Sequence, residues 1–145
     1  MFLTNFILIT LFASGGAIDC PCSSYSQKYW PIQKQVRVER KYAKAIFSGD
    51  VVSAVETKSA KGHFLVVRFK VVRSWKNIHS RMVTIITDYP APGGCGYAFQ
   101  TGRSYLVYVD RNDLGHLQAT ICSRTMPIEN AVAEMRALGH GIRWS

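Results

Sequence analysis

The sequence predicts a mainly β domain in which five strands close into a small barrel, with one helix before them and one after. Five segments rich in β-branched and aromatic residues are separated by Gly, Pro, Asn and Asp. The chain has 145 residues, 48% of them hydrophobic and 19% charged, which suits one globular domain with one core. A barrel is favoured over a flat sheet because closure removes the exposed strand edges.

The first helix and the first two strands are predicted from local patterns. Residues 33–44 contain helix-forming, mostly basic residues with apolar positions near helical spacing, which indicates an amphipathic helix. Residues 45–57 are β-branched and are interrupted by Gly49, which indicates a strand with a bulge. Residues 64–75 are the strongest strand, because apolar residues alternate with basic ones.

The C-terminal half supplies three more strands and the last helix. We expect strands over residues 82–87, 104–109 and 117–122, the last two forming a hairpin. A final helix is predicted to begin at Pro127 and to end at Gly139. Its expected buried face consists of Ile128, Val132, Met135 and Leu138. Between the third and fourth strands lies a loop over residues 89–96, dense in Pro and Gly, and such loops often carry function.

Residues 1–19 are predicted to be a secretory signal peptide. Residues 1–12 are almost entirely apolar and are followed by a run of small residues. The apolar segment is shorter than the about 20 residues that span a bilayer, and it ends too abruptly for a buried strand. No later segment is long and apolar enough to cross a membrane. We therefore expect a secreted, extracellular protein, with its one domain over residues 20–145 and no membrane contact.

The four cysteines, Cys20, Cys22, Cys95 and Cys122, are expected to form two disulfides in an oxidising compartment. Three pairings are possible, and a bridge between Cys20 and Cys22 is the least favoured because its loop is tiny and strained. Each bridge to a distant cysteine would contribute about 4 kcal/mol. A zinc site is disfavoured, because zinc-binding cysteine pairs usually have about two to four intervening residues, and Cys20 and Cys22 have only one between them.

The formal net charge is +9, and removal of residues 1–19 makes the protein more basic still. A basic secreted protein suits acidic partners such as sulfated polysaccharides, although a basic surface can also serve solubility alone. Nucleic acid is not expected as a partner. Export argues against it, and aromatic residues in barrel strands more often lie in the core than form stacking platforms.

No motif of a common enzyme class occurs in the sequence. There is no glycine-rich nucleotide-binding loop and no His-Glu-x-x-His, and the few acidic residues are scattered. The four histidines fall in predicted turns or in the tail, and disulfide-bonded cysteines cannot act as nucleophiles. We therefore expect that the protein is not an enzyme and has no cofactor of its own.

The order of landmarks resembles a known family. Along the chain lie Cys20-x-Cys22, IFSG, a long strand ending in SWKN, YPAPGGCGYAF, SYLVYV, LQATIC and a short last helix. Together they closely resemble the N-terminal inhibitory domain of the tissue inhibitors of metalloproteinases, within the netrin-like modules. The resemblance covers residues 20–145. It implies an OB-type barrel of five strands, and the disulfides Cys20–Cys95 and Cys22–Cys122.

The resemblance also implies a function, the inhibition of zinc metalloproteases by a monomer. The free α-amino group and the carbonyl oxygen of Cys20 would bind the catalytic zinc of the protease, which keeps a coordination position open. An α-amine loses its proton easily near neutral pH, because its ordinary pKa is about 7.7–8.0. The expected protease contacts are Pro21, Cys22 and Ser23 after Cys20, and Pro92, Gly93, Gly94 and Cys95 in the loop.

The chain departs from the family pattern in three ways. It lacks the cysteines of a third disulfide, and we expect it to lack the second, cysteine-rich domain of the larger members. Pro21 stands where the family commonly has Thr or Ser, whose side chain enters the specificity pocket of the protease. We expect weaker or narrower inhibition from Pro21. The alternative function is a netrin-like module that binds matrix or glycosaminoglycan and inhibits nothing.

The site of signal cleavage decides between these functions. Gly15 and Ala17 favour a cut before Ile18, which would leave the nitrogen of Cys20 in an amide that cannot bind zinc. A cut after Asp19 would expose the required amine. We favour the second site, because every other landmark of the inhibitor pattern is present and in order.

Overall fold

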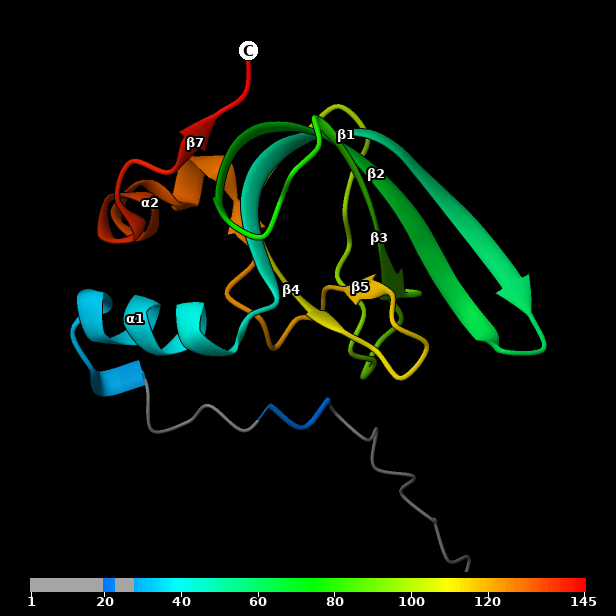
Figure 1. Ribbon diagram of the computed structural model, residues 1–145. Coiled ribbons are helices and arrows are strands. Elements are labelled where there is room, and N and C mark those ends of the chain that lie inside the picture. The colour runs from blue at the N-terminus through cyan, green and yellow to red at the C-terminus, as the bar shows by residue number, and fades with distance from the viewer. Residues whose placement is uncertain (1–19, 23–27) are drawn as a thin grey trace, which may run out of the picture.

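The computed structural model describes residues 20–22 and 28–145 (Figure 1). The predicted signal peptide over residues 1–19, its cleavage site and Ser23 lie outside the described residues. The described part is mainly β, with a ring of five paired strands, two α-helices and two disulfides. None of the helices described is long and apolar enough to cross a membrane.

The pairings of five strands follow one another around a ring in the order β1, β2, β3, β5, β4 and back to β1. All these pairs are antiparallel except β3–β5, which is parallel and joins Ile86 to Gln118. Two further short strands are added, β6 on β4 and β7 on β2. The strands are β1 (Ala45–Ser59), β2 (Gly62–Lys76), β3 (Met82–Asp88), β4 (Ser104–Arg111), β5 (Leu117–Gln118), β6 (Met126–Pro127) and β7 (Ile142–Arg143).

The strand β1 bends so that it pairs with both β2 and β4. Its register against β2 shifts at three places, one of them between Ser48 and Gly49, so the predicted bulge is confirmed. A Cβ atom at Gly49 would lie 2.7 Å from the carbonyl oxygen of Lys70, which explains why a glycine occupies the bulge. In Figure 1 β1 curls over the sheet at this end and runs straight beside β2 at the other.

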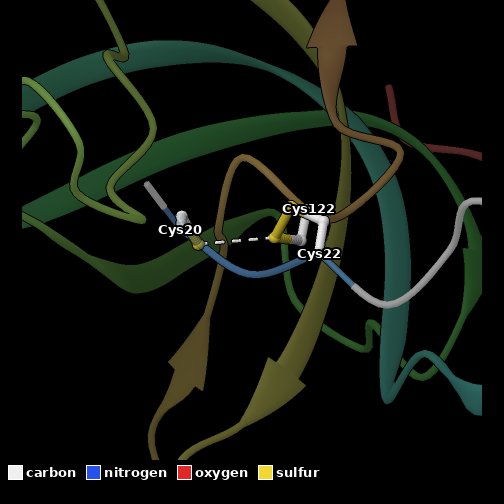
Figure 2. Close-up of side chains that lie close together, drawn as sticks. All are labelled: Cys20, Cys22 and Cys122. Carbon is white, nitrogen blue, oxygen red and sulfur yellow. Dashed lines mark hydrogen bonds between the residues drawn. A yellow bond between two sulfur atoms is a disulfide. The ribbon is translucent and has the colours of Figure 1, made fainter. Parts of the chain in front are cut away.

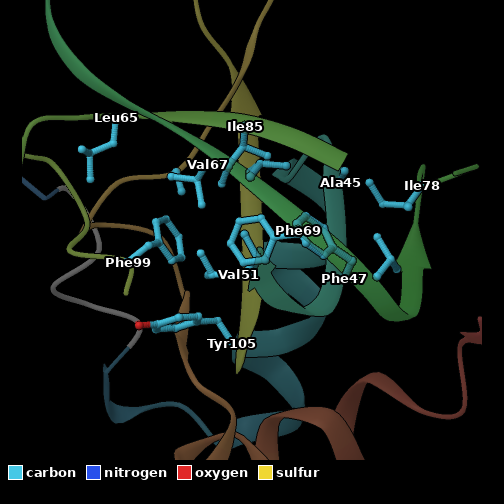
Figure 3. Close-up of a cluster of buried hydrophobic side chains, with 14 residues drawn as sticks. Ala45, Phe47, Val51, Leu65, Val67, Phe69, Ile78, Ile85, Phe99 and Tyr105 are labelled. Carbon is cyan, nitrogen blue, oxygen red and sulfur yellow. The ribbon is translucent and has the colours of Figure 1, made fainter. Parts of the chain in front are cut away.

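The core inside the ring combines aliphatic side chains with a row of aromatic rings that contact one another (Figure 3). The ring of Phe69 meets the rings of Phe47 and Phe99 edge to face, at centroid distances of 5.2 and 5.3 Å. Phe99 in turn meets Tyr105 at 5.0 Å. Such edge-to-face pairs contribute about 0.5–1.5 kcal/mol each beyond the burial of their area.

A second core lies between the outside of the ring and the helices. The helix α1 (Ile32–Tyr42) begins after Pro31, and α1 and α2 (Val132–Leu138) lie on the same side of the sheet (Figure 1). The first part of β1, residues 45–48, and most of β4 are buried on both faces, which explains the continuous apolar run in β4. The buried residues of this second core are Val36, Ala43, Ile46, Trp75, Leu106, Tyr108, Ala131 and Leu138.

The last helix begins later than predicted, and its predicted buried face is wrong at Val132 only: Leu138 is buried, and Ile128 and Met135 pack against the second core. Pro127 pairs with Tyr105 as part of β6, and the 3-10 helix η2 (Ile128–Asn130) follows before α2 begins. This tighter turn changes the helical phase, so Val132 is 58% exposed while Glu134 is buried. The buried face is formed by Ala131, Glu134 and Leu138.

The fifth strand is shorter than the predicted segment of residues 117–122. Ala119 still donates a backbone hydrogen bond to Ile86, but the chain then turns. The hydroxyl groups of Thr120 and Ser123 hydrogen-bond to nearby backbone groups, an arrangement that competes with strand pairing. The turn brings Cys122 to its disulfide partner.

Candidate functional site

Two disulfides anchor residues 20–22 on either side of Pro21. Cys20 is bonded to Cys95 and Cys22 to Cys122, with Cα–Cα distances of 5.0 and 5.2 Å. The pairing implied by the family resemblance is therefore present. Pro21 is exposed between the two anchors, while both cysteines are half-buried.

The two disulfides lie next to each other. The Sγ atom of Cys20 is 3.4 Å from the Sγ atom of Cys122. Figure 2 marks this contact with a dashed line. The sulfur atoms of Cys20, Cys22 and Cys122 lie within 4.8 Å of one another, which is close enough for a metal site. All four cysteines are oxidised, however, and a metal would need thiolates. This group of sulfur atoms is a structural clamp.

The loop over residues 89–96 is fixed at both ends by hydrogen bonds. The backbone N–H of Tyr89 donates to the carbonyl of His63, and that of Tyr97 donates to Thr87 Oγ1. Gly96 sits so close to Asp88 that a Cβ atom there would lie 1.9 Å from the Asp88 carbonyl oxygen. The backbone path just after Cys95 therefore depends on a glycine.

The tip of this loop is exposed. Ala91 and Pro92 are exposed, and the backbone N–H of Gly94 donates to the carbonyl of Ala91 across the turn. Gly93 has a φ of 76°, a conformation that favours glycine. The predicted contact residues Pro92, Gly93, Gly94 and Cys95 thus form one tight turn attached to Cys20 by its disulfide.

The side of the loop at Tyr89 is packed on the β1–β2 hairpin. The ring of Tyr89 stacks on His63 with a centroid distance of 4.0 Å. His63 Nε2 lies 2.6 Å from Glu56 Oε1. The sequence predicts a solvated turn at His63, but His63 is half-buried on β2, and its ring contacts Tyr89 of the loop.

A backbone hydrogen bond joins the loop to the turn that carries Cys122. The N–H of Ile121 donates to the carbonyl of Cys95 at 3.0 Å. Residues 20–22, the loop and this turn are consequently tied to one another by two disulfides and one backbone hydrogen bond. Ile121 is half-exposed beside Cys122 and adds an apolar side chain to this surface.

A polar network connects the end of the Cys122 turn to both helices. The guanidinium of Arg124 donates to both carboxylate oxygens of Glu134 on α2 and, at 2.6 Å, to Gln35 Oε1 on α1. The hydroxyl of Tyr108 donates to the same carboxylate at 3.0 Å. Burial raises the pKa of Tyr108, and the charge of Glu134 raises it further. The hydrogen bonds to Glu134 likewise raise the pKa of Arg124.

This network also borders a cavity of about 350 Å³ that reaches Cys22 and Cys122. Glu39 lines it, and burial raises the pKa of this carboxyl while Arg124 opposes the rise. Sequence reasoning missed the network. Arg124 and Gln35 are 89 residues apart in the chain, and no local pattern marks Glu134 as buried.

The structure thus brings together seven of the eight residues predicted to contact a protease. Cys20, Pro21 and Cys22 lie on one segment, which is linked by the Cys20–Cys95 disulfide to the turn formed by residues 92–95. Ser23 lies outside the described residues. No protein-family model matches the chain, and no curated protein sequence matches it either.

Proposed function

We propose that the protein is a secreted inhibitor of zinc metalloproteases with an OB-type, netrin-like barrel. Its mature N-terminus is Cys20, whose α-amino group and carbonyl oxygen occupy the open coordination position of the catalytic zinc in the protease. The observation that carries this proposal is the double anchoring of residues 20–22, with Pro21 exposed between two disulfides. The strand order of the ring is consistent with an OB-type barrel.

The anchoring supports inhibition on energetic grounds. A free N-terminal segment would lose conformational entropy when it entered a cleft, at about 0.5–1.5 kcal/mol per immobilised side chain. Residues held by two disulfides have lost most of that freedom before binding. The attached turn at residues 92–95 adds a second contact surface at a constant position.

The decisive experiment compares two forms of the protein that differ only at the N-terminus. One form begins at Cys20 and the other at Ile18, and both are folded with intact disulfides. We expect only the form that begins at Cys20 to inhibit a panel of zinc metalloproteases, because only its Cys20 nitrogen is an amine. Carbamylation of that amine should abolish inhibition. Equal inhibition by the form that begins at Ile18 would refute the mechanism.

The second candidate is a netrin-like module that binds matrix or glycosaminoglycan and inhibits nothing. It is favoured by the net charge of +9 and by the exposed basic side chains of Arg68 and Lys70 along β2. Clustered cations bind sulfated polysaccharide with a strong dependence on salt. Retention on heparin by a form that begins at Cys20 and inhibits no protease would select this function.

A further inference from the structure

A second, larger cavity of about 680 Å³ lies away from the disulfide clamp. It is bounded by the bulged part of β1, the neighbouring part of β2, the start of β4, and α2 with the residues that follow it. Figure 1 shows α2 and β7 at the top of the view and residues 20–22 at the bottom. The volume falls within the range of about 300–1,000 Å³ that is typical of small-molecule sites.

The lining of this cavity is apolar with basic groups around it. The apolar part comes from Val72, Ile128 and Met135. The basic groups are Arg73, Arg136 and His140, from β2, α2 and the segment after α2. The single acidic group is Asp50, whose carboxylate accepts a hydrogen bond from the hydroxyl of Ser104.

The basic groups have no acidic partner within the part of the chain that the structure describes. Neither Arg73 nor Arg136 donates a side-chain hydrogen bond there, and neither belongs to an ion pair. Arg73 is half-buried and lies directly opposite Arg143 in the β2–β7 pair. Like charges in directly opposed positions destabilise a sheet, and a bound anion would relieve this repulsion.

The walls of the cavity are held in place by the C-terminal segment. Trp75 Nε1 donates to the carbonyl of Gly139 at 2.8 Å, and the backbone N–H of Trp144 donates to the carbonyl of Val72 at 2.9 Å. Gly141, with a φ of 62°, packs so closely that a Cβ atom would lie 2.6 Å from the Ser74 carbonyl oxygen. The cavity is therefore formed before any ligand binds, which limits the entropy lost on binding.

We propose that this cavity binds a small anionic amphiphile, an apolar chain that ends in one acidic group. The chain would cover Val72, Ile128 and Met135, and the acidic group would accept hydrogen bonds from Arg73 and Arg136. Charge complementarity selects this ligand class. Two arginines without an acidic partner in the described part of the chain favour an anion, and the apolar lining favours a hydrocarbon body. The proposal does not depend on protease inhibition.

The test is a calorimetric titration of the disulfide-bonded protein with dodecanoate, below its micelle concentration. We expect saturable binding with one site per chain. Dodecyltrimethylammonium, which has the same chain and the opposite charge, should bind at least about tenfold more weakly. Butyrate, with the same head group and a shorter chain, should also bind at least about tenfold more weakly. Equal binding of the cationic amphiphile would overturn the proposal.

Variants locate the site. Arg73→Gln and Arg136→Gln together should weaken dodecanoate binding about tenfold or more, because two charge-assisted hydrogen bonds are lost. Val72→Asp, which places a carboxylate on the half-exposed apolar wall, should abolish binding. Arg68→Gln is the matched control, because it removes an exposed arginine of the same strand outside the cavity. Unchanged binding in the folded double variant Arg73→Gln, Arg136→Gln and in folded Val72→Asp would refute the site.

Discussion

At the scale of single residues, Glu134 shows how strongly a partner governs where a charge can lie. Its side chain is 3% exposed, and burial of an unpaired carboxylate would cost several kcal/mol. Arg124 and Tyr108 together provide three hydrogen bonds to it. Because Arg124 follows the Cys122 turn directly, this carboxylate also fixes the position of the disulfide clamp relative to both helices.

We therefore expect Glu134→Gln to destabilise the protein by about 3 kcal/mol, because the charge of Arg124 is left half-buried without its partner. Urea unfolding monitored by circular dichroism measures this change. Glu129→Gln is the matched control, since Glu129 pairs with Arg103 where both side chains are about half exposed. Its cost should be about 1 kcal/mol or less. Equal costs for the two variants would contradict the structural role of the network.

Pro21 is the residue on which the strength of the proposed inhibition depends. Proline has no backbone N–H, and its ring fixes φ. Pro21→Thr restores an N–H donor and adds a hydroxyl group, each able to contribute about 1 kcal/mol to a protease complex. We expect inhibition constants to fall about fivefold or more against at least one metalloprotease. Pro21→Ala restores the donor alone and should gain less. No gain against any protease would contradict this role of Pro21.

At the scale of elements, the loop over residues 89–96 illustrates how a backbone constraint positions a site. Gly96 allows the chain to pass against Asp88 directly after Cys95. Gly96→Ala forces the loop away from β3, and we expect a loss of about 3 kcal/mol in stability, at the upper end of overpacking effects. Thermal unfolding of the disulfide-bonded variants tests this.

Gly94→Ala is the control for that loop variant. A Cβ atom at Gly94 would lie 3.2 Å from the carbonyl oxygen of Ala91, a contact that a small shift relieves. Its effect on stability should be well below that of Gly96→Ala. If Gly94→Ala were the more damaging of the two, the close approach of Gly96 to Asp88 would not be what fixes the loop.

The elements also show what local sequence can and cannot predict. The five strands, the bulge at Gly49 and the first helix follow from residue patterns within each segment, and these predictions are confirmed. The split of the last helix was not predictable, because Pro127 pairs with a residue 22 positions earlier. The two-residue strand β7 likewise exists only because Trp144 and Ile142 return to β2.

At the scale of the whole molecule, the parts of the site that could be predicted are those fixed by covalent bonds. The cysteine pattern and its family resemblance implied the pairing, and hence the meeting of residues 20–22 with the loop. The Arg124 network and the 680 Å³ cavity depend on side chains from three or more elements. Such sites leave no periodic signal in the sequence, because no single segment contains them. Zinc binding and protease inhibition remain predictions.

The two disulfides contribute to stability on the same whole-chain scale. They span 75 and 100 residues, and chain entropy assigns loops of this length about 4–5 kcal/mol each. Neither disulfide belongs to the two hydrophobic cores, in which side chains of the strands and helices pack together. Removing one disulfide should therefore lower stability and leave the native β structure in place.

The double variant Cys22→Ser, Cys122→Ser separates these two contributions, and it leaves no unpaired thiol to form a wrong bridge. We expect its free energy of unfolding to fall by about 4 kcal/mol, with an unchanged far-ultraviolet circular dichroism spectrum at low temperature. Residues 20–22 would then be held at Cys20 alone, so protease inhibition should weaken more than the fold does. Loss of the β spectrum under native conditions would instead show that the strand ring depends on this disulfide to form.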